Sequence, residues 1–211
     1  MRGSLNFVAW VLGIAGVVSA MLYYFVLDVW TLPVDDPLLA ASVAPTLAAG
    51  DIVTIARRGS VERGHLLRCA DPQAPGRFIV ARAIGRYGDV LDINREIVSI
   101  DGRRTPSPRR CDPPRSTVLD PTKNTEVELD CAEEEYAGRS FSVLRDSESP
   151  LPAIKATVEP GKWFLVSDDR HIHLDSRDYG QVEPSTCQHI LFRIVGAAGF
   201  SDAKSRLTVI W

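Results

Sequence analysis

The 211-residue sequence lacks the features that define several large classes of protein. Its 24 Lys and Arg residues are scattered rather than run together, and with 27 Asp and Glu they give a net charge of −3, so we expect no binding to nucleic acid. No Cys-x-x-Cys spacing is present, which argues against a zinc site, and we expect no metal or other cofactor. No internal repeat is visible, and beyond residue 30 no helical period of useful length appears. These absences argue against nucleic-acid-binding, zinc-finger, repeat and helical-bundle proteins.

The first long feature is an uncharged apolar stretch near the N-terminus. Leu5 to Leu27 spans 23 residues, and at about 1.5 Å per residue a helix of that length crosses a hydrocarbon layer about 30 Å thick. A cleavable signal peptide is the competing interpretation, but its apolar region is usually shorter. Arg2 precedes the stretch and acidic residues follow it, so the sequence predicts a cytoplasmic N-terminus and a single-pass inner-membrane protein whose C-terminal domain lies outside.

The rest of the chain indicates a mainly β domain. Short segments rich in Val and Ile, such as 51–57, 77–84 and 90–100, are separated by Gly, Pro and Asp clusters, which is typical of antiparallel strands and turns. From Arg104 to Pro121 proline interrupts every periodic pattern, so residues 104–150 are expected to be an insertion. Strand-like patterns return at 139–144, 163–166 and 190–195.

Four cysteines are an even number in a chain expected to face an oxidising compartment, where disulfides persist. The sequence alone allows three full pairings. Cys111 and Cys131 bracket one polar segment and are the favoured pair.

Three short segments carry the candidate chemistry. The first is Ala41-Ser42-Val43-Ala44-Pro45-Thr46-Leu47, followed by Gly50-Asp51; the second is Ala81-Arg82-Ala83-Ile84-Gly85-Arg86-Tyr87-Gly88-Asp89; the third runs from Ser167-Asp168-Asp169-Arg170 to Asp175-Ser176-Arg177 and Gly180. A serine in such a context is usually only a turn hydroxyl. The order and the spacing of all three segments favour a catalytic interpretation.

In order and spacing the three segments resemble those of type I signal peptidases, which read Ser-Met-x-Pro-Thr-Leu, Lys-Arg-x-x-Gly-x-x-Gly-Asp, and Gly-Asp-Asn-Arg followed by Asp-Ser-Arg. The resemblance implies a core of coiled antiparallel sheets in two parts, residues 31–103 and 151–211, behind a membrane anchor at residues 1–30. Residues 104–150 would then form an inserted second lobe.

The resemblance also assigns residue roles. It places Ser42 as the nucleophile, with its backbone and the position of Ala40 at the oxyanion hole, and Val43 and Ala44 at the substrate subsites. It pairs Arg82 with Asp168 and Arg177 with Asp175 as structural supports.

The lysine that serves the family as base falls on Ala81, and arginine at the next position cannot replace it, because a guanidinium stays protonated. His173 stands where the family has the serine that orients the lysine. Two explanations remain open: the catalytic apparatus has decayed, or His173 leans into the space at Ala81 and acts as base, held by Asp175. A metal site at His171 and His173 with the neighbouring aspartates is a weaker alternative.

Two functions follow from the resemblance. One is a membrane-anchored serine endopeptidase that removes signal peptides from exported preproteins at small-x-small sites. The other is an inactive relative that binds signal peptides by strand addition or regulates an active peptidase or the secretion machinery. Both place the protein at membrane lipid.

Overall fold

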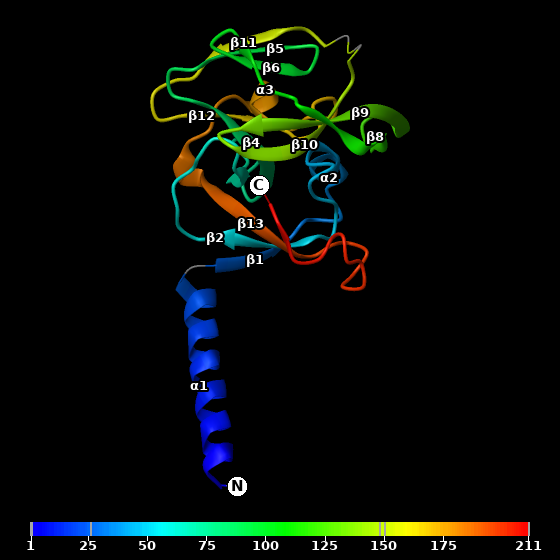
Figure 1. Ribbon diagram of the computed structural model, residues 1–211. Helices are drawn as coiled ribbons and strands as arrows, with labels where there is room; N and C mark the ends of the chain where they lie inside the picture. Colours follow the sequence, from blue (N-terminus) through cyan, green and yellow to red (C-terminus); the bar gives the residue numbers. More distant parts are fainter. Residues whose placement is uncertain (1, 26, 148, 150, 211) are drawn as a thin grey trace.

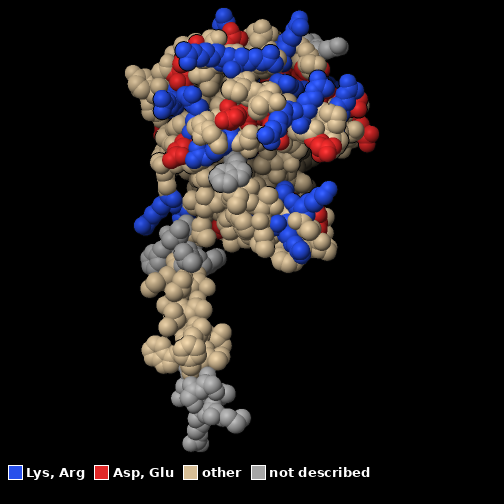
Figure 2. Space-filling model, viewed as in Figure 1, with Lys and Arg blue, Asp and Glu red and all other residues tan. Residues whose placement is uncertain are grey.

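The N-terminus forms one long helix that stands apart from a mainly β domain in the computed structural model (Figure 1), which describes residues 2–25, 27–147, 149 and 151–210. Helix α1 covers Arg2–Phe25, and its described side chains, residues 7–21, are exposed and uncharged (Figure 2). Within the described part of the chain, no helix meets the length and apolarity that crossing a membrane requires. The span predicted at Leu5–Leu27 includes Val26, which lies outside the described residues.

One large antiparallel sheet organises the domain. Its strand order is β1-β2-β13-β3-β4-β12, with β14 added to β13. The strands are β1 (Leu27–Thr31), β2 (Ile52–Ala56), β3 (Leu66–Ala70), β4 (Phe78–Arg86), β12 (Trp163–Val166), β13 (Cys187–Val195) and β14 (Thr208–Val209). The short helices α2 (Pro37–Ser42) and α3 (Ser176–Tyr179) and the 3-10 helix η1 (Pro184–Thr186) lie in the connections.

Two smaller antiparallel sheets complete the domain. One has the order β11-β5-β6-β7, formed by β5 (Val90–Asn94), β6 (Ile97–Ile100), β7 (Arg103–Arg104) and β11 (Ile154–Thr157). The other has the order β10-β9-β8, formed by β8 (Arg109–Asp120), β9 (Thr125–Tyr136) and β10 (Arg139–Arg145). In Figure 1 both lie at the end of the domain away from α1.

The segment predicted as one strand at 90–100 is a hairpin. Its turn residues, Arg95 and Glu96, have φ of 46° and 63°, the conformation that a two-residue hairpin turn requires. The turn carries no glycine, which is why the sequence pattern missed it. The next turn, between β6 and β7, is formed by Asp101 and Gly102, and both residues have positive φ, as an Asp-Gly hairpin turn requires.

The inserted lobe is more regular than the prolines suggest. Between Arg110 and Arg115 the register of β8 shifts, so that four residues lie opposite Cys131 alone, and Pro113 and Pro114 sit in this bulge, where no ladder hydrogen bond is needed. Cys111 in the bulge forms a disulfide with Cys131, which confirms the favoured pair.

The lobe shares part of its apolar core with the rest of the domain. Tyr136, Phe141 and Val143 of the lobe pack in one cluster with Leu91 and Phe164 of the other sheets. This apolar cluster therefore spans the predicted boundary between the insertion and the rest of the domain.

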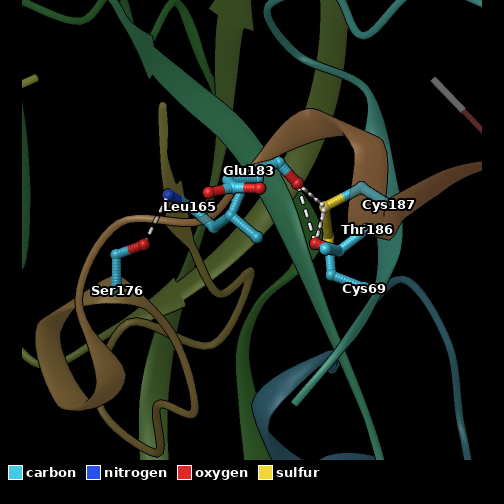
Figure 3. The surroundings of a disulfide bond; sticks show 6 residues. All are labelled: Cys69, Leu165, Ser176, Glu183, Thr186 and Cys187. Carbon is cyan, nitrogen blue, oxygen red and sulfur yellow. Dashed lines mark hydrogen bonds between the residues drawn. A yellow bond between two sulfur atoms is a disulfide. The ribbon is translucent and has the colours of Figure 1, made fainter. Parts of the chain in front are cut away.

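A second disulfide, Cys69–Cys187, joins the neighbouring strands β3 and β13 of the large sheet (Figure 3). Close by, the Leu165 amide donates to the Ser176 hydroxyl, at 2.9 Å, which fixes α3 against β12. These links hold the frame on which the three motif segments are mounted.

Candidate functional site

Ser42 is the last residue of α2 and is fully buried. The helix begins where the Asp36 carboxylate accepts the Leu39 amide, at 3.0 Å, and Pro37 fits the first turn because no partner is needed for its missing N–H. The Ser42 hydroxyl donates to the Leu39 carbonyl at 2.9 Å, inside the same helix. Its backbone carbonyl accepts the Asp169 amide at 3.0 Å. The hydroxyl therefore bonds to main chain, and among the described residues it has no titratable partner.

Ala81, where the resemblance places the base, lies on β4 and has no exposed surface. It packs in an apolar cluster with Leu67, Ile79 and Leu165. Its neighbour Val80 points to the opposite face of the sheet, where it packs with Leu39 and Val43 beside Ser42. The cluster around Ala81 is thus apolar; it also includes Cys69, and Tyr179 and Cys187 pack against it.

Leu174 contacts both clusters, so it lies where the apolar surroundings of Ala81 meet those of α2. Its amide donates to the Ser167 hydroxyl at 3.1 Å, which anchors it in the third segment. A leucine at this junction supplies apolar contact and no proton acceptor.

His173 does not take the position predicted for a relocated base. Its Nδ1 lies 2.8 Å from the Asp178 carboxylate, and no hydrogen bond joins it to Asp175 or Ser42 among the described residues. The ring lines a cavity of about 220 Å³ with residues that include Ile93, Glu96 and Arg177. Arg177 donates to the Asp175 carboxylate, and His173 is held by Asp178 instead of by Asp175 as predicted.

The predicted pair of Arg177 and Asp175 is present, with 2.7 Å between Nη2 and Oδ2. Burial by itself raises the pKa of Asp175, but the charge and hydrogen bonds of Arg177 outweigh it and lower that pKa to about 2. One donor atom each of His173, Asp175 and Asp178 lie within 4.8 Å of one another, as in a metal site. The guanidinium that neutralises Asp175 opposes a second cation there.

The predicted pair of Arg82 and Asp168 is also present, and both side chains are completely buried. Two guanidinium nitrogens contact the two carboxylate oxygens at 2.8 and 2.7 Å. Thr46, from the turn after the serine, donates to the same carboxylate at 2.5 Å, and the Phe141 ring of the lobe lies 3.6 Å below the guanidinium carbon. This network joins all three motif segments to the lobe, and the parts played by Thr46 and Phe141 were not predicted.

Asp169 also has surroundings that the sequence interpretation did not predict. Its carboxylate is buried, Oδ1 accepts the amides of His171 and Ile172 at 2.9 and 2.8 Å, and Oδ2 has no partner among the described residues. Burial raises its pKa to about 7. The one available signal was the family motif, which has asparagine at this position.

Next to it, His171 lies 2.9 Å from the buried Glu96 of the hairpin turn. That hydrogen bond raises the pKa of His171, so the site contains a charge network between the third segment and β5–β6. His171 and His173 point to different carboxylates and do not share a ligand position.

The two residues predicted to contact substrate differ in exposure, because Val43 is buried and Ala44 is half-buried. Val43 is fully buried in the core, and Ala44 packs against the lobe cluster that contains Leu129 and Cys131. Ala40 is half-buried and offers a methyl group where an oxyanion donor was expected. Val43 has no exposed surface in this structure, and its role at a subsite stays a prediction.

An open cleft of about 490 Å³ lies between the segment that leads into α2 and the start of β4. Its walls are Pro33, Asp35, Asp36, Leu39, Gly76, Arg77 and Phe78. The Arg77–Asp36 ion pair, at 3.0 Å, links the two walls.

The edge of β4 in this cleft carries backbone groups that have no partner among the residues that the structure describes. The Ala83 amide donates to the His65 carbonyl next to β3, at 2.9 Å, so the odd-numbered residues of β4 direct their N–H and C=O towards β3. The even-numbered residues Val80 and Phe78 therefore direct theirs away from β3. On that side, the described pairing with β12 ends at Arg82. Val80 is covered, but Phe78 is 39% exposed, so the edge is open at Phe78.

Comparison with known proteins identifies the family of the chain. The sequence model of the family described as "Signal peptidase, peptidase S26" matches residues 6–195. The chain is also 25% identical over 154 residues to "Signal peptidase I" of Streptococcus pneumoniae serotype 4 (strain ATCC BAA-334 / TIGR4), covering 66% of this chain and 70% of the relative. The protein of the same name from Streptococcus pneumoniae (strain ATCC BAA-255 / R6) gives the same identity and coverage. With a match that runs from α1 through the end of β13, the chain belongs to the signal peptidase family, peptidase S26.

Proposed function

We propose that this chain is a membrane-anchored member of the signal peptidase family that captures signal peptides of exported preproteins without hydrolysing them. Two observations together carry the proposal. Ser42 is fully buried with its hydroxyl hydrogen-bonded within its own helix, and position 81, where the family has its base, is a fully buried alanine. Family membership supports a signal-peptidase-like function and preproteins that bear signal peptides as the ligands.

The proton chemistry supports the non-hydrolytic half of the proposal. A serine hydroxyl is a weak nucleophile until a neighbouring base accepts its proton. The Leu39 carbonyl that accepts the Ser42 hydroxyl is not a base of useful strength, and Ala81 packs in an apolar cluster. Loss of one member of a catalytic set lowers rates by on the order of 10⁴.

The open strand edge supports the capture half. An extended peptide can add to the N–H and C=O of Phe78 while its side chains lie in the cleft. Closure at Val80 and Ala81 would stop such a peptide short of Ser42. Capture without turnover is the expected result.

The location of the protein is part of the proposal. The uncharged stretch 5–27 would anchor the chain in the inner (cytoplasmic) membrane, and the β domain would lie on the outer side, where both disulfides persist. There it would meet membrane lipid and preproteins, and an active peptidase or the secretion machinery could receive the captured peptide. A reporter that works only in the cytoplasm should be inactive when fused after Trp211; activity of that fusion would contradict this orientation.

Hydrolysis by a relocated base is the competing function, and one observation favours it. His173 and Asp178, 2.8 Å apart, have the histidine–carboxylate arrangement that orients a general base. A rearrangement that brought His173 to Ser42 would be needed, because no hydrogen bond joins them among the described residues.

The deciding experiment uses the full chain in detergent with a preprotein whose signal peptide ends in a small-x-small site, from pH 5 to 9. We expect no product that depends on Ser42 in comparisons of the native protein with Ser42→Ala and His173→Ala. We also expect the native protein to retain the preprotein in a pull-down. Phe78→Ala should reduce retention, whereas Tyr87→Ala, at an aromatic residue 66% exposed outside the cleft, should not.

Cleavage abolished by Ser42→Ala would refute the non-hydrolytic proposal. If His173→Ala abolished it too, with an activity limb near the ordinary histidine pKa of about 6.5, the Ser–His alternative would be supported. Equal retention by the native protein and Phe78→Ala would show that the cleft is not the capture site.

A further inference from the structure

We propose that the cleft beside β4 selects peptides that carry a lysine or arginine, and that Asp35 recognises the positive charge. The inference rests on the proposed capture of peptides in this cleft and adds the chemistry of the preferred peptide. Three features of the cleft support it: an apolar wall, the Arg77–Asp36 ion pair, and the Asp35 carboxylate, which has no hydrogen bond or ion pair to any described residue.

The apolar part of the cleft comes from Pro33, Leu39 and Phe78. Leu39 is 1% exposed and forms the floor, whereas Phe78 remains 39% exposed. The position of Phe78 is fixed from behind, because Arg68 lies 4.5 Å from its ring centre and Trp30 packs edge-on at 6.3 Å. A hydrocarbon chain entering the cleft would therefore meet a preformed surface.

The charged groups in the cleft differ in whether they already have hydrogen-bond or ion-pair partners. Asp36 uses one oxygen to cap α2 and the other to pair with Arg77. Arg77 is neutralised by the same contact, at 3.0 Å. Asp35 is exposed and has no hydrogen bond or ion pair to any other residue that the structure describes.

This combination matches the chemistry of the long basic side chains. Lysine and arginine have an apolar stem that packs on hydrocarbon and a cationic head that stays in water. With the backbone added at Phe78, the stem would lie on Pro33 and Phe78 and the head would reach Asp35. An acidic peptide would meet a net negative cleft, because two carboxylates stand against one guanidinium.

The expected selectivity is modest because Asp35 is exposed. Exposed ion pairs of this kind change a dissociation constant by roughly twofold to fivefold. Arg77 sets a limit as well, since its guanidinium competes for Asp36. Arg77→Gln should therefore release a second carboxylate and enlarge the preference.

The test measures binding of soluble, fluorescein-labelled peptides of seven residues to the full chain in nanodiscs. Each peptide is built from alanine and serine with one lysine, placed at successive positions, and each has a counterpart with norleucine, which keeps the stem and lacks the charge. We expect at least one lysine position to bind roughly twofold to fivefold more tightly than its norleucine counterpart. Asp35→Asn should remove the difference and Arg77→Gln should increase it.

The matched control is Glu126→Gln, which removes one exposed carboxylate on β9 and should leave the preference unchanged. Equal binding of every lysine and norleucine pair, with capture intact, would overturn this inference and leave the proposed function standing. A preference that survives in Asp35→Asn would also overturn it. Failure of the native protein to bind any of the peptides or the preprotein would overturn the proposed function itself and this inference with it.

Discussion

The buried carboxylate of Asp169 should make the stability of the domain depend on pH near neutrality. Its pKa rises from an ordinary 3.8 to about 7, because the side chain is enclosed and the charged form loses its hydration. The amides of His171 and Ile172, hydrogen-bonded to Oδ1, lower the pKa and offset part of the burial effect. Oδ2, without a partner among the described residues, gains no such compensation.

The direction follows from proton linkage. The folded domain holds the Asp169 proton more tightly than the unfolded chain does, so the free energy of unfolding falls as pH rises from about 4 to about 7. At about 1.4 kcal/mol for each tenfold change in proton affinity, the loss is at most about 4 kcal/mol and is complete above the folded pKa.

His171 acts in the same direction. The hydrogen bond to Glu96 raises its pKa, so the stability it contributes below its unfolded pKa is lost as pH rises through the folded value. The pH dependence that Asp169 contributes to the free energy of unfolding must therefore be separated from that of His171 by a substitution, because the native curve contains both.

Asp169→Asn separates it. The amide oxygen still accepts the two backbone N–H groups, the shape is kept, and no charge forms on that side chain. At pH 8 the variant should be more stable than the native protein by up to about 4 kcal/mol, and near pH 4 the two should be similar.

Urea unfolding of the full chain in mild detergent, followed by tryptophan fluorescence from pH 4 to 9, measures both curves. Their difference cancels the titration of groups that the two proteins share. Glu126→Gln, at an exposed carboxylate, serves as the control and should follow the native curve. A difference between Asp169→Asn and the native protein that is constant with pH would refute the reasoning.

Three further predictions concern the framework of the site. Arg82→Ala should lower the free energy of unfolding by about 3–5 kcal/mol, since it leaves a buried carboxylate unpaired, whereas Arg115→Ala, with a side chain 62% exposed, should cost under about 1 kcal/mol; equal losses in urea unfolding would contradict this. Replacing Cys111 and Cys131 by serine should lower the free energy of unfolding by about 3 kcal/mol, because the disulfide closes a loop with a sequence separation of 20. A variant as stable as the native, oxidised protein in urea unfolding would contradict this. Gly85→Ala should cost about 1–3 kcal/mol in thermal or urea unfolding, because its Cβ would come within 2.5 Å of Leu91 Cδ1 and 2.9 Å of Val158 Cγ2; a native-like transition would show that these side chains give way freely.

Several features of the fold were accessible from sequence because they depend on local chemistry. Val- and Ile-rich segments between turn residues are strands, and the Asp101-Gly102 turn forms where its positive φ angles are tolerated. The strands that escaped prediction have other patterns. β3 is buried on nearly every residue and so shows no alternation, and β8 contains two prolines that only a bulge could accommodate.

The three motif segments by themselves indicated the family, and the family resemblance implied the two ion pairs Arg82–Asp168 and Arg177–Asp175, which are present and buried. The disulfide Cys111–Cys131 was favoured because these cysteines bracket one polar segment of the sequence. Only the tertiary structure decided where His173 turns, that Val43 is enclosed, and that Asp169 lies against Ser42 with an unpartnered oxygen. These outcomes depend on which distant segments pack together. Contacts between residues far apart in the sequence decide which side chains of the lobe, the hairpin turn and the third segment are buried and which hydrogen-bond partner each one takes. No local sequence pattern encodes these contacts.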